Sequence, residues 1–426
     1  MLKKGINRRA FGMLAVGTCS LLAAPSVLGK TVARVVVVGG GPAGVIAVQH
    51  LAASYPGIQV TLIEANSVYL TPFYGNHYLS GYRSLSSLSF DYQLVQKLRS
   101  VKVIHQRVER VDGVLKQVHL ASGQTVEYDK LIMATGAGAV AGAIEGYDEA
   151  AETIFPHAYS SSAPEQWSLF EKQLQNMKDG GLVVMSVPKR PYQCTPAPYE
   201  RASLIADFLK KKKPGSKLLI LDGNDSFPLM DIMLDYWDTQ YGENVEWMSA
   251  EFGGVLNSVD ASDKSLTTDD GPLKPDVANI IPPQRAGRLL NEVGLVDQTG
   301  WCPIIPKSFE STLIKNIYVL GDAIEGGDMP KSAAAAASSA MVCATVIGNQ
   351  VSGKTIAVPE LVNACYFSLD QKRALHVSGR YRIDGERIDG IEGHASALGE
   401  DEGMRMDTAH KSAEWYKSLT RQMFGT

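Results

Sequence analysis

The stretch ARVVVVGGGPAG, residues 33–44, decides the fold. Its apolar first half is typical of a buried parallel strand. It leads into glycines in the spacing G-x-G-x-x-G, and a helical pattern follows over residues 45–53. A second apolar strand, residues 60–63, ends at Glu64, which lies 20 residues after Gly44. Strand, glycine loop, helix, strand and acid in this order predict a unit that binds a dinucleotide.

Each position of the loop has a physical reason. Gly39 permits the tight turn, Gly41 lets the backbone approach a pyrophosphate, and Gly44 lets the helix pack closely on the strand. Pro42-Ala43 begin the helix, whose N-terminus would face the phosphates. Glu64 would accept hydrogen bonds from ribose hydroxyls and repel a 2′-phosphate.

Two later segments favour FAD over NAD as the dinucleotide. Residues 130–136 predict a strand that ends in Ala134-Thr135-Gly136, a loop seen in flavoproteins with two dinucleotide domains. Residues 317–323 predict another strand, which ends in Gly321-Asp322. This aspartate would meet the ribityl and phosphate region of the flavin, although alone it could be a simple turn residue. The three motifs together, in this order, predict FAD.

A helix of very small residues is predicted over residues 333–347, after Lys331. Its positive N-terminus would stabilise an anionic reduced flavin ring, or its alanines could only allow close packing. The predicted cofactor-binding residues are Gly39, Gly41, Pro42, Ala43, Gly44, Glu64, Ala134, Thr135, Gly136, Gly321, Asp322 and Lys331.

A second strand–helix unit begins at residues 181–187 but lacks a glycine loop. No glycine occurs between Gly181 and Gly215, so a pyrophosphate would have no close backbone approach. The domain shape is therefore expected without NAD(P)H as the reductant. The loop carries Cys194 instead, at the end of a strand, where open α/β sheets place ligand chemistry.

The length and the net charge of the chain limit the number of domains and the kinds of partner. The chain has 426 residues with 41 Lys and Arg against 45 Asp and Glu, so a global positive field for nucleic acid is excluded. We predict an α/β fold with two Rossmann-like domains, as in glutathione-reductase-like flavoproteins, plus a C-terminal interface domain. The predicted boundaries are 31–147 with 276–357 for FAD, 148–275 for the second domain and 358–426 for the last.

Residues 1–29 predict a twin-arginine signal peptide. Arg8-Arg9 is followed by an apolar run that ends in small residues, and the alternative is an amphipathic anchor helix. The run is too short to span a bilayer. This route exports folded, cofactor-loaded proteins, so we expect a periplasmic mature chain with no membrane-spanning segment.

Four cysteines follow the signal. Cys343 and Cys302 are predicted to be buried and inert, whereas Cys194 and Cys365 could pair, either as a structural bridge or as a reactive one. No C-x-x-C-H motif for a c-type haem occurs, and no metal site is predicted.

Several of these segments together resemble one family, the flavoprotein subunit of flavocytochrome c sulfide dehydrogenase, from about residue 32 to 424. The segments that carry the resemblance are CTPAPYERAS at 194–203, IPPQRAG at 281–287, GWCP at 300–303, MPKS at 329–332, NACY at 363–366, WY at 415–416 and MFG at 423–425.

The resemblance implies that Cys194 and Cys365 form a redox-active disulfide over the flavin. Hydrosulfide would attack one sulfur, and the released thiolate would donate to the flavin, at C4a. Glu200 matches a family glutamate that would accept the proton, or it could be a surface carboxylate at a helix start. Trp415 matches a tryptophan that covers the site, or it could belong to the core. Electrons would pass to a c-type cytochrome subunit in a heterodimer.

One position departs from the family pattern. Many members attach FAD through a cysteine after the strand that ends at the Glu64-type acid, where this chain has Pro72. No cysteine lies between Cys19 and Cys194, so we predict noncovalent FAD.

Two other functions stay open. One is a sulfide:quinone oxidoreductase, which would dock on a membrane through apolar C-terminal helices. The tail at 400–426 instead mixes charges with a narrow apolar stripe that predicts core or subunit contact. The other is an accessory flavoprotein that reduces or reactivates a sulfur-oxidising partner through the same dithiol.

Overall fold

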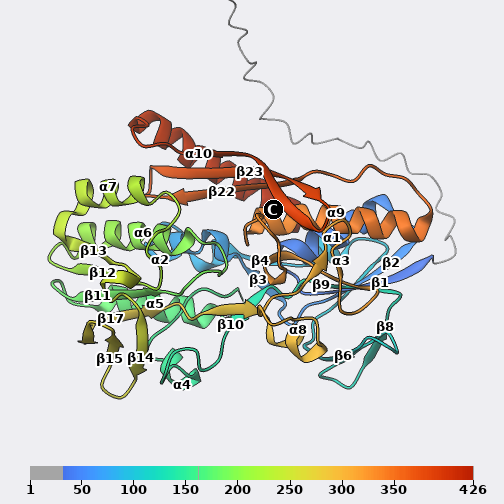
Figure 1. The fold of residues 1–426 in the computed structure, drawn as a ribbon, viewed down its shortest axis with the longest axis horizontal. Helices are drawn as coiled ribbons and strands as arrows, with labels where there is room; N and C mark the ends of the chain where they lie inside the picture. Colours follow the sequence, from blue (N-terminus) through green and yellow to red (C-terminus); the bar gives the residue numbers. More distant parts are fainter. Residues whose placement is uncertain (1–31, 162, 426) are drawn as a thin grey trace, which may run out of the picture. The chain divides into compact units, whose positions relative to one another are not determined.

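The computed structural model describes residues 32–161 and 163–425, which form one compact unit. The predicted signal peptide at 1–29 lies outside the described residues. The predicted domain boundaries stay predictions. Within the unit, two open sheets and a C-terminal sheet with its helix provide the framework of the site (Figure 1).

A seven-stranded sheet is built around the glycine motif, in the order β19-β20-β21-β9-β1-β2-β5. Its strands are β1 (Ala33–Val38), β2 (Ile58–Ile63), β5 (Val101–Ile104), β9 (Lys130–Met133), β19 (Ile304–Ile305), β20 (Glu310–Ser311) and β21 (Ile317–Val319). The five strands from β21 to β5 run parallel. Val35 and Val37 of β1 are fully buried, which explains the unbroken apolar run.

Helices α1 (Pro42–Ser54) and α9 (Ala333–Ser352) pack against each other beside this sheet. The small residues of α9 permit the close approach, since a Cβ on Gly348 would lie 2.2 Å from the Tyr55 ring. Among the described residues, α9 is the helix long and apolar enough to cross a membrane, with a mean hydropathy of 1.3. The sequence predicts this helix over residues 333–347, as a helix of small residues and not as a membrane span. More than half of it is buried inside the protein, which accounts for its composition as a core helix.

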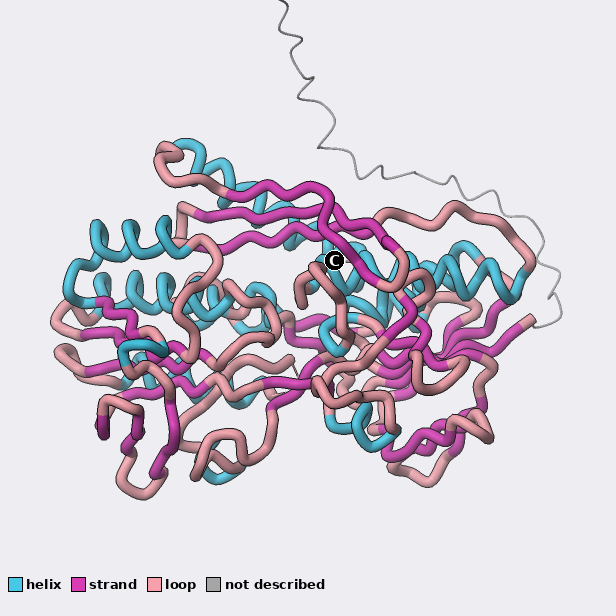
Figure 2. Tube along the Cα trace, in the orientation of Figure 1, coloured by secondary structure: helices cyan, strands magenta, loops and turns pink. Residues whose placement is uncertain are grey.

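A four-stranded parallel sheet has the order β13-β12-β11-β17. Its strands are β11 (Leu182–Val187), β12 (Lys217–Asp222), β13 (Val245–Met248) and β17 (Val277–Ile280), and its helices are α5 (Pro164–Asn176), α6 (Ala197–Lys212) and α7 (Met230–Tyr241). Helices (cyan) alternate with strands (magenta) along this part of the chain in Figure 2. The predicted α/β class with two Rossmann-like sheets is confirmed.

The C-terminal part consists of β22 (Leu361–Ser368), β23 (Ala374–Asp384), β24 (Arg387–Ala395) and α10 (Glu402–Phe424). The strands form an antiparallel sheet whose first strand contacts both α9 and α6 (Figure 1). On α10, Tyr416, Leu419 and Met423 are buried in the core. The narrow apolar stripe of the tail therefore packs inward.

Shorter elements complete the chain. The helical ones are η1 (Pro72–Tyr74), α2 (Asn76–Leu79), η2 (Leu85–Leu88), α3 (Gln93–Gln96), α4 (Glu149–Glu152), η3 (Gly242–Asn244), η4 (Ala250–Phe252), α8 (Arg288–Val293) and η5 (Gly321–Ala323). The strands are β3 (Val68–Leu70), β4 (Ser89–Asp91), β6 (Val108–Asp112), β7 (Gln117–Leu120), β8 (Thr125–Glu127), β10 (Ala137–Ala139), β14 (Leu256–Asp260), β15 (Ser265–Thr268), β16 (Gly271–Leu273) and β18 (Gln284–Ala286).

Candidate active site

A cavity that opens to solvent lies where the two open sheets, α9, β22 and α10 meet, with about 770 Å³ of empty space when its open mouth is included. It brings together Pro42 at the start of α1, Cys194 in the loop after β11, Asp322 after β21, Cys365 on β22 and Trp415 on α10. Strands of open sheets end at such crevices, so loops from distant sequence positions converge there. Of the predicted catalytic residues, Cys194, Cys365, Glu200 and Trp415 all line this cavity.

The glycine loop has the geometry that a pyrophosphate requires. A Cβ on Gly44 would lie 1.8 Å from the Gly39 carbonyl oxygen, and one on Gly39 would lie 2.4 Å from the Ala134 carbonyl oxygen. Gly39 also has a φ of +105°. A Cβ on Gly41 would meet nothing closer than Tyr69 at 3.8 Å. Close packing therefore requires glycine at positions 39 and 44. At position 41 the absence of a side chain instead leaves space for a ligand in front of the α1 N-terminus.

Two buried oxygen atoms lack a hydrogen-bond partner beside the predicted flavin loops. They are Asp322 Oδ1 and Thr135 Oγ1, two of the four such side-chain atoms among the described residues. The other oxygen of Asp322 accepts a hydrogen bond from Gln193 Nε2 at 2.7 Å. Burial raises the Asp322 pKa to about 6. Buried polar atoms are rarely left unpaired, so these atoms fit a polar ligand such as a ribityl chain.

Other predicted cofactor residues shape the loops. Gly136 and Gly321 have φ values of +70° and +74°, which glycine adopts without strain. Glu64 accepts hydrogen bonds from the backbone amides of Gly40 at 2.7 Å and Asn66 at 2.9 Å. The carboxylate at the end of β2 is thus held against the glycine loop, as ribose recognition requires.

Lys331 is bound mainly to the protein itself. Its Nζ donates to the carbonyl oxygens of Asp322 at 3.0 Å and Ile324 at 2.7 Å, and lies 3.5 Å from the centre of the Trp301 ring. Burial lowers its pKa to about 8. Its own carbonyl oxygen accepts a hydrogen bond from the Cys194 amide at 2.7 Å. Lys331 therefore fastens the flavin loop to the cysteine loop, and cofactor contact by its ammonium stays a prediction.

The Cys194 loop is held in an uncommon backbone conformation. Cys194 has a φ of +50°, in the left-handed region that costs a residue with a Cβ about 1–2 kcal/mol. The Tyr159 hydroxyl donates to the carbonyl oxygens of Gln193 at 2.7 Å and Cys194 at 3.3 Å. Together with the bond to Lys331, these contacts impose the conformation that presents the Cys194 side chain to the cavity.

Cys365 approaches the same cavity from β22. Its Sγ donates to Asn363 Oδ1 at 3.3 Å, and Ser332 Oγ, at the N-cap of α9, donates to the same oxygen at 2.6 Å. Burial raises the pKa of the Cys365 thiol, while its hydrogen bonding with Ser332 and Asn363 opposes that shift.

Both cysteines are free thiols in the structure. Burial raises the pKa of the Cys194 thiol well above its ordinary value, and the neighbouring charge of Cys365 adds to the shift. Both cysteines line the same cavity. Neither thiol is a preformed thiolate nucleophile at neutral pH.

Glu200, in the first turn of α6, is a buried carboxyl rather than a surface one. It is 7% exposed, and burial raises its pKa to about 7. Its Oε2 accepts from Asn76 Nδ2 at 2.8 Å, and Oε1 accepts from the Ser368 amide at 2.8 Å. A carboxyl with a pKa near neutrality can take up and release protons at working pH.

The sequence analysis missed Arg201 as a structural determinant of the site. Its guanidinium is 1% exposed and donates to Asn76 Oδ1 at 3.0 Å, Asn279 Oδ1 at 2.8 Å and the carbonyl oxygens of His157 and Ala158. It thereby fixes the amide that holds Glu200. The quoted run PYERAS contained this residue, but nothing local in it reveals partners from three other segments.

Trp415 is half-buried and contacts the ring of Phe73 edge to face, with centroids 5.9 Å apart. Its centroid also lies 5.9 Å from that of Tyr366, the neighbour of Cys365. Pro72, in η1, lines the cavity beside Phe73. The aromatic wall thus closes the cavity on the side where Pro72 replaces the expected cysteine.

In the second sheet, aromatic side chains surround the acid at the end of the second strand. Asp222, at the end of β12, corresponds to the ribose-binding acid, but it accepts hydrogen bonds from Tyr199 at 2.7 Å and Trp247 at 2.9 Å. Tyr199 stacks on Phe227 with centroids 3.8 Å apart. Aromatic side chains therefore use the hydrogen-bonding oxygens of Asp222 and fill the space around it. This arrangement agrees with the missing glycine loop.

The two remaining cysteines are fully buried away from this cavity. Cys302 and Cys343 are both 0% exposed, and burial raises the pKa of Cys302 to about 12. The prediction that they are buried is confirmed. Among the described residues, no cluster of His, Cys, Asp and Glu could hold a metal ion.

Family models match three consecutive parts of the chain. Residues 33–166 match pyridine nucleotide-disulphide oxidoreductase, and residues 168–282 match the central part of the flavoprotein chain of sulfide dehydrogenase (flavocytochrome c). Residues 357–424 match the flavin-binding part of flavocytochrome c sulphide dehydrogenase. These matches support FAD as the cofactor of the cavity.

Individual relatives agree with this grouping. Sulfide-quinone reductase of Aquifex aeolicus is 28% identical over 182 residues, 42% of this chain and 40% of that protein. Mitochondrial sulfide:quinone oxidoreductase of Schizosaccharomyces pombe is 23% identical over 272 residues, 60% of this chain and 56% of that protein. The chain thus matches only about half the length of these curated relatives.

Solved structures share the fold. Sulfide:quinone oxidoreductase from Aquifex aeolicus superposes with a TM-score of 0.69 at 17% identity, covering 91% of this chain and 92% of that one. A NAD-dependent persulfide reductase from A. fulgidus gives 0.64 at 15% identity, with 89% and 77% coverage. The chain is therefore similar to the flavoproteins of the pyridine nucleotide-disulphide oxidoreductase superfamily, and its central and C-terminal parts match the family models of the flavoprotein chain of flavocytochrome c sulfide dehydrogenase.

Proposed function

We propose that this chain is an FAD-dependent sulfide dehydrogenase that oxidises sulfide through a disulfide between Cys194 and Cys365. One observation carries the proposal. Two cysteines from segments 171 residues apart line one cavity with Asp322, whose unpaired buried oxygen fits the flavin. The two other cysteines of the described residues, Cys302 and Cys343, are fully buried in the core, so sulfide in the cavity does not reach them.

The first step is thiol–disulfide exchange in the oxidised enzyme. Hydrosulfide attacks one sulfur of the disulfide, so that one S–S bond breaks, a cysteine persulfide forms and the other cysteine leaves as a thiolate. Both cysteines are engaged in the disulfide in this state, so hydrosulfide supplies the nucleophile.

Glu200 takes the proton that remains on the persulfide. Its pKa of about 7 leaves a substantial carboxylate fraction at neutral pH, and it lines the same cavity as both sulfurs. Asn76 and Ser368 hold both of its oxygens in place. Net, hydrosulfide becomes zero-valent sulfur, one proton and two electrons.

Bound FAD would supply the acceptor for this electron pair and a route for single electrons. Loss of the pair would join the persulfide and the thiolate of the two cysteines as a trisulfide, which holds the zero-valent sulfur. The α9 N-terminus, with Ser332 as N-cap, lies at the cavity through Ala333 and Ala336. Its partial positive charge would favour an anionic reduced ring. With Pro72 at the position of the usual cysteine, we expect the flavin to be held without a covalent bond.

The proposed electron acceptor is a c-type cytochrome subunit in the periplasm. The family matches support this partner, and the twin-arginine pattern at residues 1–29 supports the location. A sulfide:quinone oxidoreductase function is favoured by the curated relatives. An accessory flavoprotein that reduces or reactivates a sulfur-oxidising partner would use the same dithiol.

Anaerobic mixing with acceptors tests these functions against each other. The purified holoprotein is reduced with sulfide and then mixed with oxidised cytochrome c or with a soluble quinone, while flavin absorbance is followed. We expect reduction by sulfide and faster reoxidation by cytochrome c. Preferential reoxidation by quinone would favour the second function. Reduction by a protein persulfide but not by sulfide would favour the accessory role.

A further inference from the structure

A closed ring of hydrogen bonds joins the Cys194 loop to the segment that follows β21. Gln193 Nε2 donates to Asp322 Oδ2 at 2.7 Å, and the Cys194 amide donates to the carbonyl oxygen of Lys331 at 2.7 Å. Lys331 Nζ in turn donates to the carbonyl oxygen of Asp322 at 3.0 Å. Because Gln193 and Cys194 are neighbours in the sequence, these bonds close the ring. The Cys194 backbone therefore cannot shift without disturbing the Asp322 segment.

The side chain of Gln193 is the part of this ring that reaches the carboxyl of Asp322. The Gln193 backbone is held separately, since its amide donates to Gln284 Oε1 at 2.9 Å and its carbonyl oxygen accepts from the Tyr159 hydroxyl at 2.7 Å. Asp322 is 8% exposed, and its Oδ1 has no hydrogen-bond partner. The carboxyl thus holds the cysteine loop with one oxygen and leaves the other for a ligand in the cavity.

The Cys194 loop depends on such contacts to keep its conformation. Cys194 has a φ of +50°, in a region that residues with a Cβ occupy only where the surroundings impose it. A disulfide tolerates little variation in the separation and direction of its two Cβ atoms. Pairing of Cys194 with Cys365, which lines the same cavity, therefore requires a loop that is held in one place.

A ligand on Asp322 and a disulfide at Cys194 favour the same arrangement of this ring. A donor that bonds to Oδ1 fixes the carboxyl, and with it the acceptor of the hydrogen bond from Gln193. Two events that stabilise one common state reinforce each other, and the effect is equal in both directions.

We propose that Gln193 is a positioning residue that couples the binding of FAD at Asp322 to the pairing of Cys194 with Cys365. The inference rests on the proposed function, in which both the flavin and the disulfide are needed. Bound FAD stabilises the disulfide through Gln193, and the disulfide tightens FAD binding by the same factor. The oxidised enzyme therefore holds its flavin most firmly in the state that hydrosulfide attacks.

The coupling is measured by a cycle of four proteins, with the dissociation constant of FAD as the readout. They are the air-oxidised wild type, the double variant Cys194→Ser/Cys365→Ser, Gln193→Met, and the triple variant that combines all these changes. Methionine is close to glutamine in length but has no N–H group to donate. Each holoprotein is diluted and the released flavin is followed by its fluorescence, so the flavin stays oxidised and no sulfide is needed. Peptide mapping establishes whether the two cysteines are paired.

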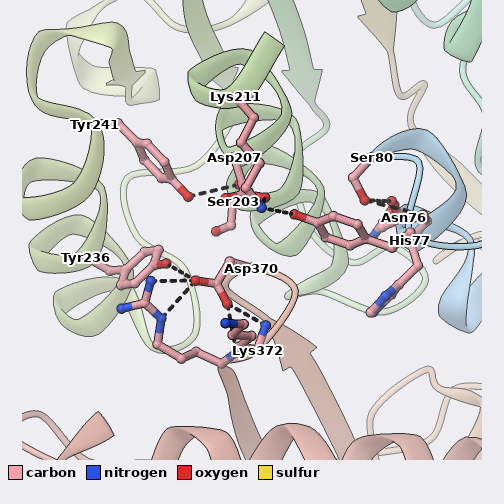
Figure 3. A network of polar contacts seen from close by, with 12 residues as sticks. Asn76, His77, Ser80, Ser203, Asp207, Lys211, Tyr236, Tyr241, Asp370 and Lys372 are labelled. Atoms are coloured by element: carbon pink, nitrogen blue, oxygen red, sulfur yellow. Dashed lines mark hydrogen bonds and ion pairs between the residues drawn. The ribbon is translucent and has the colours of Figure 1, made fainter. Parts of the chain in front are cut away.

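Tyr236→Phe, made with and without the double cysteine change, is the matched control, because it too removes a hydrogen bond to a buried aspartate. The Tyr236 hydroxyl donates to Asp370 Oδ2 at 2.8 Å, a contact drawn in Figure 3. Asp370 follows β22, the strand that carries Cys365, but neither Asp370 nor Tyr236 lines the cavity. The control therefore shows what the loss of such a bond does without contact with the flavin.

We expect the disulfide to tighten FAD binding by about 10-fold in the wild-type background, a usual size for coupling between two sites. The ratio should fall to within about twofold of one in the Gln193→Met background and keep its wild-type value in Tyr236→Phe. A purely structural role of Gln193 would weaken FAD binding with and without the disulfide alike and leave the ratio unchanged. In glutathione buffers, the disulfide of the Gln193→Met holoprotein should be reduced at a potential about 30 mV higher than in wild type, the equivalent of tenfold for a two-electron couple.

A wild-type ratio that survives in Gln193→Met would overturn the coupling, as would equal FAD affinity of the wild type and the double cysteine variant. Either result leaves the proposed function standing. Unpaired Cys194 and Cys365 in the air-oxidised wild type would instead overturn the proposed function and the coupling together.

Discussion

The Gln193 side chain donates a hydrogen bond to Asp322 at 2.7 Å and so joins the residue before Cys194 to the flavin loop. The bond uses one oxygen of Asp322 and leaves the other buried and unpaired. The Cys194 loop and the predicted cofactor contact are thus parts of one hydrogen-bonded unit.

Asp322→Ala is expected to weaken FAD binding by about 10- to 100-fold, since a hydrogen bond to a charged group contributes about 1.5–3 kcal/mol. The measurement is the dissociation constant of FAD for the apoprotein. Ser186→Ala is the control, because Ser186 also has a buried unpaired hydroxyl but does not line the cavity. Equal affinity of the two variants for FAD would show that Asp322 does not contact the flavin.

Gly41→Ala and Gly44→Ala are expected to fail in different ways. The Gly41 variant meets no protein atom closer than 3.8 Å, so the apoprotein should keep its thermal stability and lose FAD affinity. The Gly44 variant places a Cβ 1.8 Å from the Gly39 carbonyl oxygen and should unfold or become insoluble. Thermal melts of apoprotein with and without FAD distinguish the two. Unchanged FAD affinity in Gly41→Ala would contradict the placement of the pyrophosphate.

The rate of flavin reduction by sulfide is expected to rise with pH through about 7. Burial raises the pKa of Glu200 to about 7, and the proton acceptor is its carboxylate, which is lost as the pH falls below that value. Ionisation of sulfide itself affects wild type and Glu200→Gln alike. The difference between their pH profiles therefore isolates Glu200. Parallel profiles would show that another group takes the proton.

Acid precipitation is expected to release the flavin into the supernatant. Pro72 offers no nucleophile at the position where covalent members of the family have cysteine, and it lines the cavity. Absorbance of pellet and supernatant near 450 nm measures the partition. Yellow colour retained by the washed precipitate would contradict noncovalent binding.

The sequence predicted the flavin-binding half of the fold because its signals are local. The run at 33–44 specifies strand, loop and helix within twelve residues, and the structure forms β1 and α1 there. Glu64 follows at the expected distance and accepts a hydrogen bond from the Gly40 amide of the loop, and its contact with a ribose stays a prediction. The absence of glycine between Gly181 and Gly215 likewise predicts that the second sheet lacks a glycine-rich dinucleotide loop.

The catalytic cavity could be predicted only in part. Cys194 and Cys365 were paired through a family resemblance, since no local pattern joins residues so far apart. Arg201 was missed because its partners come from other segments and appear only after folding. The ammonium of Lys331 bonds to loop carbonyls, an arrangement that depends on the tertiary path of residues 322–324.

Anaerobic titration with sulfide tests the disulfide most directly, in wild type, Cys194→Ser, Cys365→Ser and the control Cys343→Ala. Cys343 is buried outside the cavity, so its loss should not affect the chemistry. We predict that the flavin absorbance of wild type and Cys343→Ala is bleached at one sulfide per flavin, whereas both serine variants stay oxidised. Bleaching of both serine variants as readily as wild type would contradict the account.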